Sequence, residues 1–306
     1  MGGYRSRREF LGLSSAAGLL LAAGCSRADN GGTGSGPVII KHVFGETTLA
    51  APPTRVVSAG LTEHDDLLAV GVVPIAVTKW FGEQPLGVWP WAQARLGEAI
   101  PAVLNLDNGI QVDPIANLKP DLIVAINAGL DADTYRKLSE IAPTIAQSGG
   151  DAFFEPWKEQ ASAVGKAVFT SDQMTQLVDA VGEKFAAVAQ ANPTFKDHTA
   201  MLLSSSVPID TATAAVTGWR ADFLTAMGFQ PAATAEDADI LIWSTESDAQ
   251  QAALLADPAM AGLRATQRNR NVFTPADLAG AIAYASPLSY PVVADQLPPL
   301  LARALG

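Results

Sequence analysis

The sequence alternates short β-branched strands with short helices, and this alternation limits what the chain can fold into. Apolar runs closed by glycine, proline or a polar residue recur within residues 55–147 and again within residues 199–275. Each run is followed by a helical pattern or by a turn. Strands that alternate with helices usually pair in parallel, because each helix carries the chain back to the same edge of the sheet. The sequence therefore predicts two α/β series.

One long helix is predicted between the two series. From Asp172 to Ala191 the apolar residues recur at intervals of three and four, and Asn192-Pro193 ends the pattern. A helix of this length spans about 30 Å. We predict two Rossmann-like α/β lobes joined by this helix, with a ligand cleft between the lobes at the carboxyl ends of their strands. The predicted parts are an N-terminal lobe over 38–170, a connecting helix over 171–192 and a C-terminal lobe over 193–306.

The first 37 residues have the pattern of an export signal followed by a lipid-attachment site and a tether. Three arginines precede an uncharged apolar run, Leu11–Ala23, and small residues lead to Cys25, the one cysteine of the chain. The run is shorter than the roughly 18–20 residues that a membrane-spanning helix needs, so residues 1–24 read as an export signal. "SRREFLG" resembles a twin-arginine signal and "LAAGC" resembles a bacterial lipobox. We therefore expect a lipid on Cys25, a glycine-rich tether over 25–37, and a protein anchored to the outer face of the cytoplasmic membrane.

Charge and motifs exclude several classes of function. The formal net charge of −11 makes nucleic acid and anionic lipid headgroups poor partners, so we expect membrane contact through the lipid alone. The sequence contains no G-x-G-x-x-G, no P-loop and no G-x-S-x-G, and we expect no enzyme. Its three histidines are scattered without the spacing of a metal site, and we expect no metal ligands.

Four segments carry a resemblance to a known family. They are "PPTRVVSAGLTEHDDLLAVGVVPIAVTKWFG", "IANLKPDLIVAIN", "YRKLSEIAPTIA" and "SPLSYPVVADQL". Together they resemble the substrate-binding proteins that deliver ferric siderophores, haem or cobalamin to ABC importers. The resemblance implies two lobes that move little about one rigid helix, a monomer, and docking on an importer permease through acidic residues. Asp113 takes the first docking position, and Glu236 is the candidate in the second lobe.

Candidate ligand-binding residues cluster where strands are predicted to end, among them a strand over 213–219 and a ligand loop over 275–284. Flat aromatic walls suit catecholate, phenolate or porphyrin ligands, and a cation beside them suits an anionic ligand. Histidine and tyrosine are also possible axial ligands of a haem iron. The candidates are Lys79, Trp80, Phe81, Trp89, Trp91, His64, Trp219, Arg220, Trp243 and Tyr284.

Three functions remain open at this stage. The first is non-covalent capture of a ferric siderophore for an ABC importer, with no cofactor bound covalently beyond the lipid on Cys25. The second keeps the fold and binds haem. The third is a cell-envelope adaptor that has lost transport. Cobalamin binders share the same framework, so the sequence does not separate cobalamin from the iron ligands.

Overall fold

Five parallel strands form the sheet of the first lobe, in the order β5-β4-β3-β6-β7. The computed structural model describes residues 36–306, apart from the side chains of residues 212 and 213. The predicted signal and Cys25 lie outside the described residues. Most strand residues are buried, as expected where helices cover both faces of a parallel sheet. The strands are β3 (Val56–Ser58), β4 (Ala76–Thr78), β5 (Ala102–Leu104), β6 (Leu122–Ala125) and β7 (Thr144–Ala146).

Helices and one hairpin complete the first lobe. The hairpin, which we did not predict, pairs β1 (Val38–His42) with β2 (Gly45–Leu49) in antiparallel fashion. The helices are α1 (Glu63–Ala69), α2 (Pro90–Gln93), α3 (Val112–Asn117), α4 (Ala132–Ser139) and α5 (Trp157–Ala167), with short 3₁₀ turns η1 (Pro85–Gly87) and η2 (Ala94–Leu96). Helix α5 was also missed, although its apolar residues recur at intervals of four and three.

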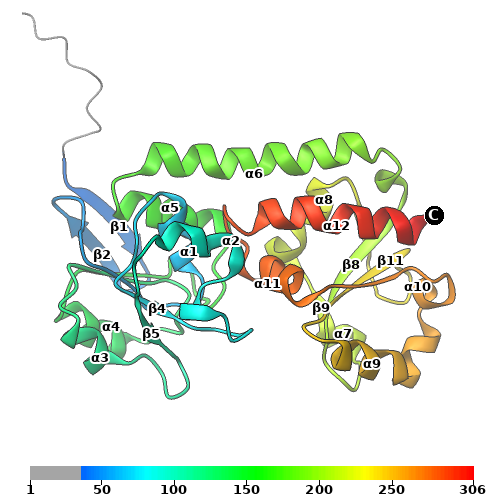
Figure 1. Ribbon diagram of the computed structural model, residues 1–306, viewed down its shortest axis with the longest axis horizontal. Helices are drawn as coiled ribbons and strands as arrows, with labels where there is room; N and C mark the ends of the chain where they lie inside the picture. Colours follow the sequence, from blue (N-terminus) through cyan, green and yellow to red (C-terminus); the bar gives the residue numbers. More distant parts are fainter. Residues whose placement is uncertain (1–35) are drawn as a thin grey trace, which may run out of the picture. The chain divides into compact units, whose positions relative to one another are not determined.

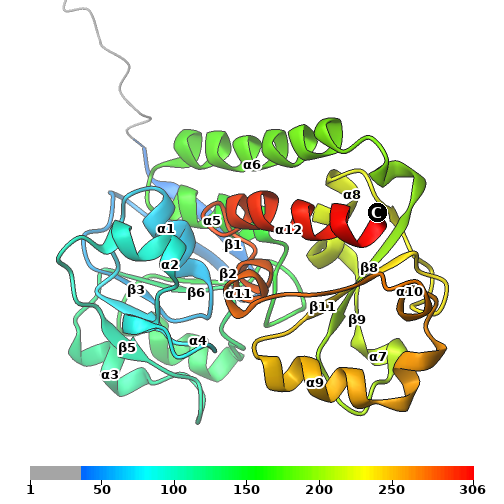
Figure 2. The same ribbon diagram turned by 45° about the vertical axis from the view of Figure 1, so that its right-hand side comes forward.

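The predicted long helix is α6 (Ser171–Ala191), and it contributes to two hydrophobic cores. Its Met174 packs into a core of the first lobe. Val181 and Phe185 pack into the core of the second lobe, and Val178 contacts both. Figures 1 and 2 show α6 running along one side of both lobes. The prediction of one helix between two series is confirmed.

The sheet of the second lobe has the order β10-β8-β11-β12, and these strands are parallel. Their bounds are β8 (Thr199–Ser204), β10 (Gln230–Pro231), β11 (Ile240–Ser244) and β12 (Asn271–Phe273). Of the strand expected over 213–219, only two residues form a strand. The chain instead forms α7 (Thr211–Ala214), a two-residue antiparallel strand β9 (Ala215–Val216) and a 3₁₀ turn η4 (Gly218–Ala221). Gly218 has φ of +64°, which ends the extended run.

Seven further helical segments surround this sheet. They are η3 (Phe195–Asp197), α8 (Asp222–Ala226), α9 (Asp248–Ala256), η5 (Pro258–Gly262), α10 (Arg264–Gln267), α11 (Ala276–Tyr284) and α12 (Tyr290–Leu305). We expected residues 275–284 to form a ligand loop, and this was wrong because they form helix α11. Among residues 36–306, no helix is both long and apolar enough to cross a membrane.

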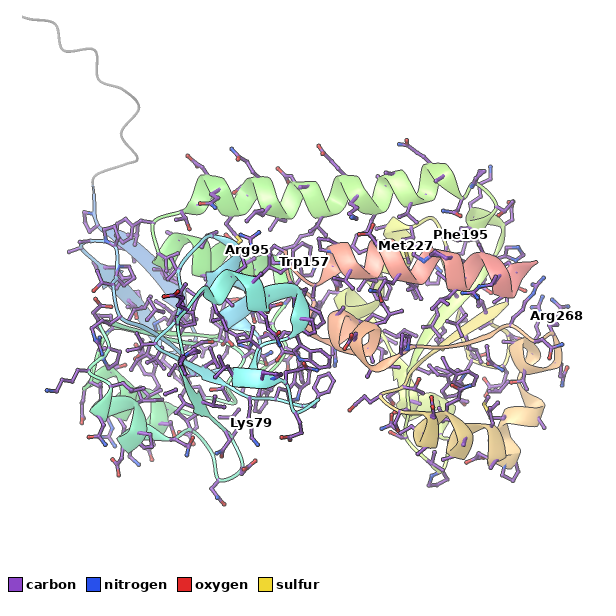
Figure 3. All side chains as sticks on the ribbon, in the orientation of Figure 1. Lys79, Arg95, Trp157, Phe195, Met227 and Arg268 are labelled. Atoms are coloured by element: carbon purple, nitrogen blue, oxygen red, sulfur yellow. The ribbon has the colours of Figure 1, made fainter. Side chains whose placement is uncertain are left out.

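Side chains of both lobes meet around α5, α11 and α12. Trp157, at the start of α5 and labelled near the middle of Figure 3, packs edge-on against Tyr290 of α12 with ring centroids 5.2 Å apart. Ile282 and Tyr290 belong to the same core as Phe185 of α6. The structure therefore confirms the predicted class, an α/β protein with two lobes and one long connecting helix.

Candidate functional site

Six aromatic rings gather where the lobes meet. We call this set the aromatic group: Trp80, Phe81, Trp89, Trp91, Phe154 and Tyr284. Tyr284 lies at its centre, with ring centroids 5.7 Å from Trp80, 6.4 Å from Phe81, 6.0 Å from Trp89 and 5.7 Å from Trp91. Tyr284 ends α11 of the second lobe, whereas the other five rings belong to the first. One side chain of the second lobe thus completes an aromatic surface built by the first.

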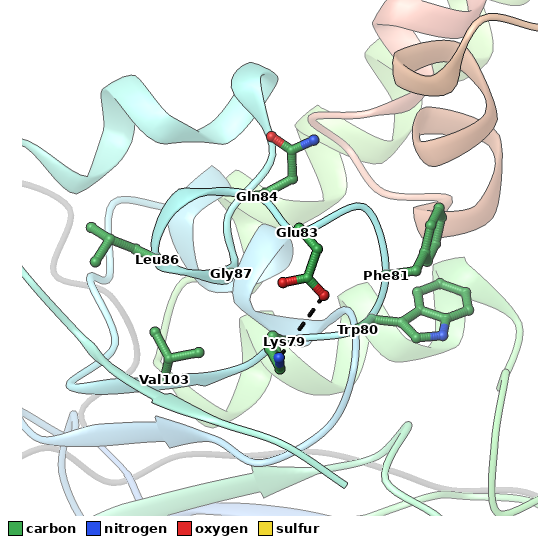
Figure 4. A pocket seen from close by; sticks show the side chains of 8 residues that line it. All are labelled: Lys79, Trp80, Phe81, Glu83, Gln84, Leu86, Gly87 and Val103. Carbon is green, nitrogen blue, oxygen red and sulfur yellow. Dashed lines mark ion pairs between the residues drawn. The ribbon is translucent and has the colours of Figure 1, made fainter. Parts of the chain in front are cut away.

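The rings reach this place because their segments follow strands or begin helices. Trp80 and Phe81 come directly after β4, and their rings meet edge-on at 4.7 Å. Figure 4 shows both rings pointing away from Leu86 and Val103, toward the helix drawn in brown. Phe154 follows β7, and its backbone N–H donates to Oδ1 of Asn127 at 2.8 Å. The carboxyl ends of the strands therefore supply the site, as expected for an open α/β sheet.

Trp89 is fixed by two glycines from different lobes. A Cβ on Gly82 would lie 2.6 Å from the Trp89 ring, and a Cβ on Gly280 of α11 would also lie 2.6 Å from it. The indole is 1% exposed and stacks on Trp91 at 5.1 Å. Trp89 therefore acts as a packing residue between the lobes in this arrangement and offers a ligand almost no surface.

Arg220 brings a positive charge from the second lobe to the aromatic group. Its guanidinium carbon lies 4.4 Å from the centre of the Phe154 ring, a cation–π contact. Within the described part of the chain, no carboxylate pairs with this guanidinium within 4.0 Å. Burial lowers the pKa of Arg220 from its ordinary value, but an arginine still keeps its charge. The site therefore holds a half-buried cation that has no counter-ion among residues 36–306.

Lys79 lies beside a pocket that Trp80 and Phe81 also line, and it is already paired. Its Nζ is 4.0 Å from Oε1 of Glu83, and both side chains are well exposed. The adjacent cavity has a volume of about 120 Å³ and is drawn in Figure 4. An exposed ion pair of this kind contributes little, so Lys79 remains available to a stronger anion.

The space between the lobes is nearly filled by side chains. A cavity of about 10 Å³ lies there, bordered by Asn127, Phe154, Trp219 and Tyr284 among others. Trp219 is half-buried and packs on the core of the second lobe. Because the cavity is smaller than a siderophore, a ligand has to displace aromatic side chains or separate the lobes.

Trp243 does not belong to this site. It lies in β11, is 0% exposed, and donates from Nε1 to Oδ1 of Asn271 at 3.0 Å. Its ring packs in a core cluster of the second lobe with Met201 and Leu254. The expectation of a ligand contact is corrected here, because the side chain points from the central strand into the interior.

Backbone strain is concentrated around the aromatic group. Seven non-glycine residues in the described part of the chain have positive φ, and four of them border the site: Glu83, Leu86, Phe154 and Ala285. A phenylalanine at φ of +60° is unusual, since its Cβ is crowded in the left-handed region. Such strain persists where the surrounding structure fixes it, often at functional sites. Phe154 contacts Arg220 of the second lobe, and Ala285 directly follows Tyr284. The strain at these two residues supports a functional role for the aromatic group.

Four consecutive titratable residues lie buried beneath the aromatic group. Glu63, His64, Asp65 and Asp66 of α1 are at most 1% exposed. Burial lowers the pKa of His64 to about 4, and neither of its ring nitrogens has a hydrogen-bond partner among the described residues. His64 is therefore neutral near pH 7. Its ring contacts Tyr284 edge-on at 5.5 Å, so it acts as an inner wall of the site and has no open face for a ligand.

Burial also raises the pKa of the three acids. The pKa of Glu63 rises, although backbone N–H groups of Thr62 and Asn127 donate to its carboxylate. The pKa of Asp65 rises to about 6, and that of Asp66 rises well above its usual value. Asp66 accepts a hydrogen bond from Nε2 of Gln160 at 2.7 Å. Each acid therefore favours its protonated form in the folded protein more than in the unfolded chain.

Asp66→Asn should make the folded protein less sensitive to rising pH. Because the folded pKa lies above the unfolded value, the stability that comes from protonated Asp66 is full below about pH 4 and is lost as the pH rises through the folded pKa. We expect the variant to gain about 1 kcal/mol over the wild type near pH 7.5 and little near pH 4. Urea unfolding at both pH values measures this difference. An equal difference at both values would contradict the prediction.

The two predicted docking acids are both exposed. Asp113 lies in the first turn of α3. Glu236 lies between β10 and β11 and accepts a hydrogen bond from Oγ1 of Thr211 at 2.8 Å. Hydrogen bonds from its own backbone N–H and from Thr211 lower the pKa of Glu236. Their exposure leaves both carboxylates accessible to a partner, and their role in docking stays a prediction.

Sequence reasoning missed Asp65, Gly280 and Phe154 as individual residues of the site. The segment containing Phe154, "FFEPW", carries a visible signal, since two aromatics stand beside a proline after a strand. The contribution of Gly280 has no local signal, because it depends on the Trp89 ring in the other lobe.

The chain belongs to the periplasmic binding protein family, whose model matches residues 56–278. The crystal structure of a periplasmic solute binding protein from Mycobacterium smegmatis is similar to it, with 60% identity and a TM-score of 0.84, and covers 89% of this chain and 99% of that one. This agrees with the family resemblance found in the sequence.

Two curated relatives are more distant. The Fe(3+)-citrate-binding protein YfmC of Bacillus subtilis is 26% identical over 50% of this chain and 49% of its own length. The Fe(3+) dicitrate-binding periplasmic protein FecB of Escherichia coli is 27% identical over 51% of this chain and 53% of its own length. The chain therefore spans about half the length of these curated relatives. All three names are those of binding proteins.

Proposed function

We propose that this protein is an extracytoplasmic solute-binding protein that captures an anionic ferric siderophore for an ABC importer. The observation that carries the proposal is the half-buried Arg220, which lies against the aromatic group and has no ion-pair partner within residues 36–306. A desolvated cation beside aromatic faces suits a ligand that combines negative charge with flat, polarisable surface. Family membership and the names of the two ferric citrate-binding relatives support the same ligand class.

The proposed binding residues are those of the site that have surface to offer. Trp80, Phe81 and Trp91 are partly exposed. From the second lobe, Arg220 lies against the Phe154 ring, and Trp219 borders the same small cavity as Phe154 and Tyr284. Lys79 would add a second cation at the edge. Because a siderophore saturates the coordination of its iron, the protein needs no direct ligand to the metal. Tyr284 and His64 would support the site from behind.

Attachment and delivery complete the proposal. A lipid on Cys25 would hold the protein at the outer face of the cytoplasmic membrane, with residues 25–37 as a tether. Asp113 and Glu236 would meet basic residues of the permease. Two acyl chains are needed for stable anchoring, since one chain binds only marginally.

Titration of tryptophan fluorescence tests the ligand class. The panel is ferric citrate, a ferric catecholate siderophore, a ferric hydroxamate siderophore, haem and cobalamin. We expect saturable quenching by an anionic ferric chelate, weakened about tenfold in Trp80→Ala because one stacking face is lost. Quenching by haem alone would replace the siderophore with haem. No quenching across the panel by a folded sample would refute ligand capture and favour an adaptor role.

A further inference from the structure

Asp65 forms a direct bridge between the two lobes. Its Oδ2 accepts a hydrogen bond from Oγ of Ser286 at 2.6 Å and another from Nε1 of Trp91 at 2.7 Å. Ser286 lies in the segment that connects α11 with α12, and Trp91 belongs to the aromatic group. One buried carboxylate oxygen therefore holds a segment of the second lobe and a ring of the ligand site together.

The bridge continues into the start of α12. The hydroxyl of Ser286 accepts hydrogen bonds from the backbone N–H groups of Ser289 at 2.9 Å and Leu288 at 3.2 Å. It therefore satisfies the backbone donors of the N-cap residue Ser289 and of the residue before it. Two residues earlier stands Tyr284, the centre of the aromatic group, followed by Ala285 at φ of +49°. The position of Tyr284 thus depends on where Ser286 is held.

The surroundings of Asp65 contain acids and no paired cation. Glu63, His64 and Asp66 share its helix, and Tyr284 faces it from α11. Trp91 of α2 and Gln160 of α5 are neutral. The cations on the helices that pack against α1 do not pair with Asp65. Arg95 of η2 donates to the backbone carbonyl of Ala69. Lys158 and Lys166 of α5 are exposed, as is Glu159 between them. Within residues 36–306, no ion pair within 4.0 Å compensates Asp65.

We propose that Asp65 is a positioning residue that holds Tyr284 in the ligand site, and that protonation of its carboxyl group strengthens the contact between the lobes. Burial raises the pKa of Asp65 and outweighs the hydrogen bonds from Ser286 and Trp91, which favour the ionised carboxylate. A protonated Asp65 therefore stays buried without the cost of an isolated charge. When the segment between α11 and α12 that contains Ser286 moves away from α1, water reaches the carboxyl group of Asp65 and the group ionises. Separation therefore releases a proton, so acid favours the contact and neutral pH loosens it. The effect on ligand binding rests on the proposed function, whereas the contact itself does not.

The size of the effect follows from linkage. The pKa of Asp65 is about 6 in the contact and 3.8 for an ordinary aspartate. The group therefore strengthens the contact fully below about pH 3.8, and this contribution is lost as the pH rises through about 6. Between about pH 7.5 and about pH 5, the equilibrium constant for the contact should rise about tenfold.

Amide hydrogen exchange without ligand tests the proposal in the purified protein. Protection of the Ser289 and Tyr290 amides, corrected for intrinsic exchange, should be about tenfold greater near pH 5 than near pH 7.5. In Asp65→Asn, protection near pH 5 should exceed protection near pH 7.5 by less than about twofold. The matched control is Asp66→Asn, which removes a neighbouring buried acid that does not touch Ser286 and should keep the tenfold dependence.

Several outcomes would overturn the proposal. If amide protection in Asp65→Asn kept its full pH dependence, the titrating group would be a residue other than Asp65. The same conclusion would follow if Asp66→Asn lost the pH dependence. If Asp65→Asn fails to fold, Ser286→Ala provides the second test, because it removes the donor to Asp65. We expect Ser286→Ala to lower protection of the Tyr290 amide at both pH values, because this amide donates to the Ser286 backbone carbonyl, which the substitution keeps. Unchanged protection of the Tyr290 amide would refute the bridge. Since no ligand is present, a failed siderophore titration leaves these results intact.

Discussion

Replacing Gly280 with alanine should destabilise the protein by about 1–3 kcal/mol. The added Cβ would lie 2.6–2.8 Å from three carbons of the Trp89 ring, closer than real Cβ atoms approach. The ring is closely packed on its other side as well, since a Cβ built on Gly82 would also lie 2.6 Å from it. Gly280 and Trp89 are both buried, so either α11 or the indole must shift. Thermal unfolding and urea unfolding measure the loss.

Gly182→Ala is the matched control for this substitution. Gly182 lies on the exposed face of α6, and nothing stands within 4 Å of its Cβ position. Alanine there should stabilise by about 0.5–1 kcal/mol, because glycine inside a helix loses more entropy on folding. Adding Trp89→Phe to Gly280→Ala should recover part of the lost stability. Equal effects of Gly182→Ala and Gly280→Ala would show that Trp89 does not fix α11.

Arg220→Ala should weaken binding of ferric citrate, the anionic probe of the proposed site, by about 10–100-fold. Hydrogen bonds to charged groups contribute about 1.5–3 kcal/mol, and Arg220 is the half-buried cation that faces the aromatic group. The affinity of Arg220→Lys for ferric citrate should lie between those of the wild type and Arg220→Ala, since lysine keeps the charge but lacks the planar guanidinium group. Isothermal titration calorimetry measures each dissociation constant.

Arg303→Ala controls for the loss of one positive charge. Arg303 is exposed near the end of α12, so its removal should change the affinity less than about twofold. A neutral ferric hydroxamate should lose less affinity than ferric citrate in Arg220→Ala. If Arg220→Ala and Arg303→Ala bind ferric citrate equally well, Arg220 is not the cation of the site.

The strands and the long helix were predictable because their signals are local. Buried parallel strands such as β6 read as continuous apolar runs, and the spacing of apolar residues in α6 follows one helical face. Helix α11 was missed for a physical reason. Apart from the exposed Asp277 in its first turn, its sequence, ADLAGAIAY, is apolar or small, so no continuous polar face marks its period.

The site was only partly predictable, since its geometry joins distant segments. Trp80 and Arg220 were chosen from their places at expected strand ends, and the structure puts both at the lobe contact. Trp243 satisfied the same criterion and lies in the core, because a strand end does not reveal which way a side chain points. The pairing of Arg220 with Phe154 depends on the packing of two lobes, which no local pattern encodes.

Helix α6 also has a consequence for how the chain melts. Because Met174 belongs to one core and Phe185 to the other, neither core is complete without the same helix. An intermediate with one lobe unfolded would leave half of the apolar face of α6 in water, at a cost that grows with the exposed area. Partial unfolding of either lobe is therefore suppressed, and the two lobes share one cooperative transition.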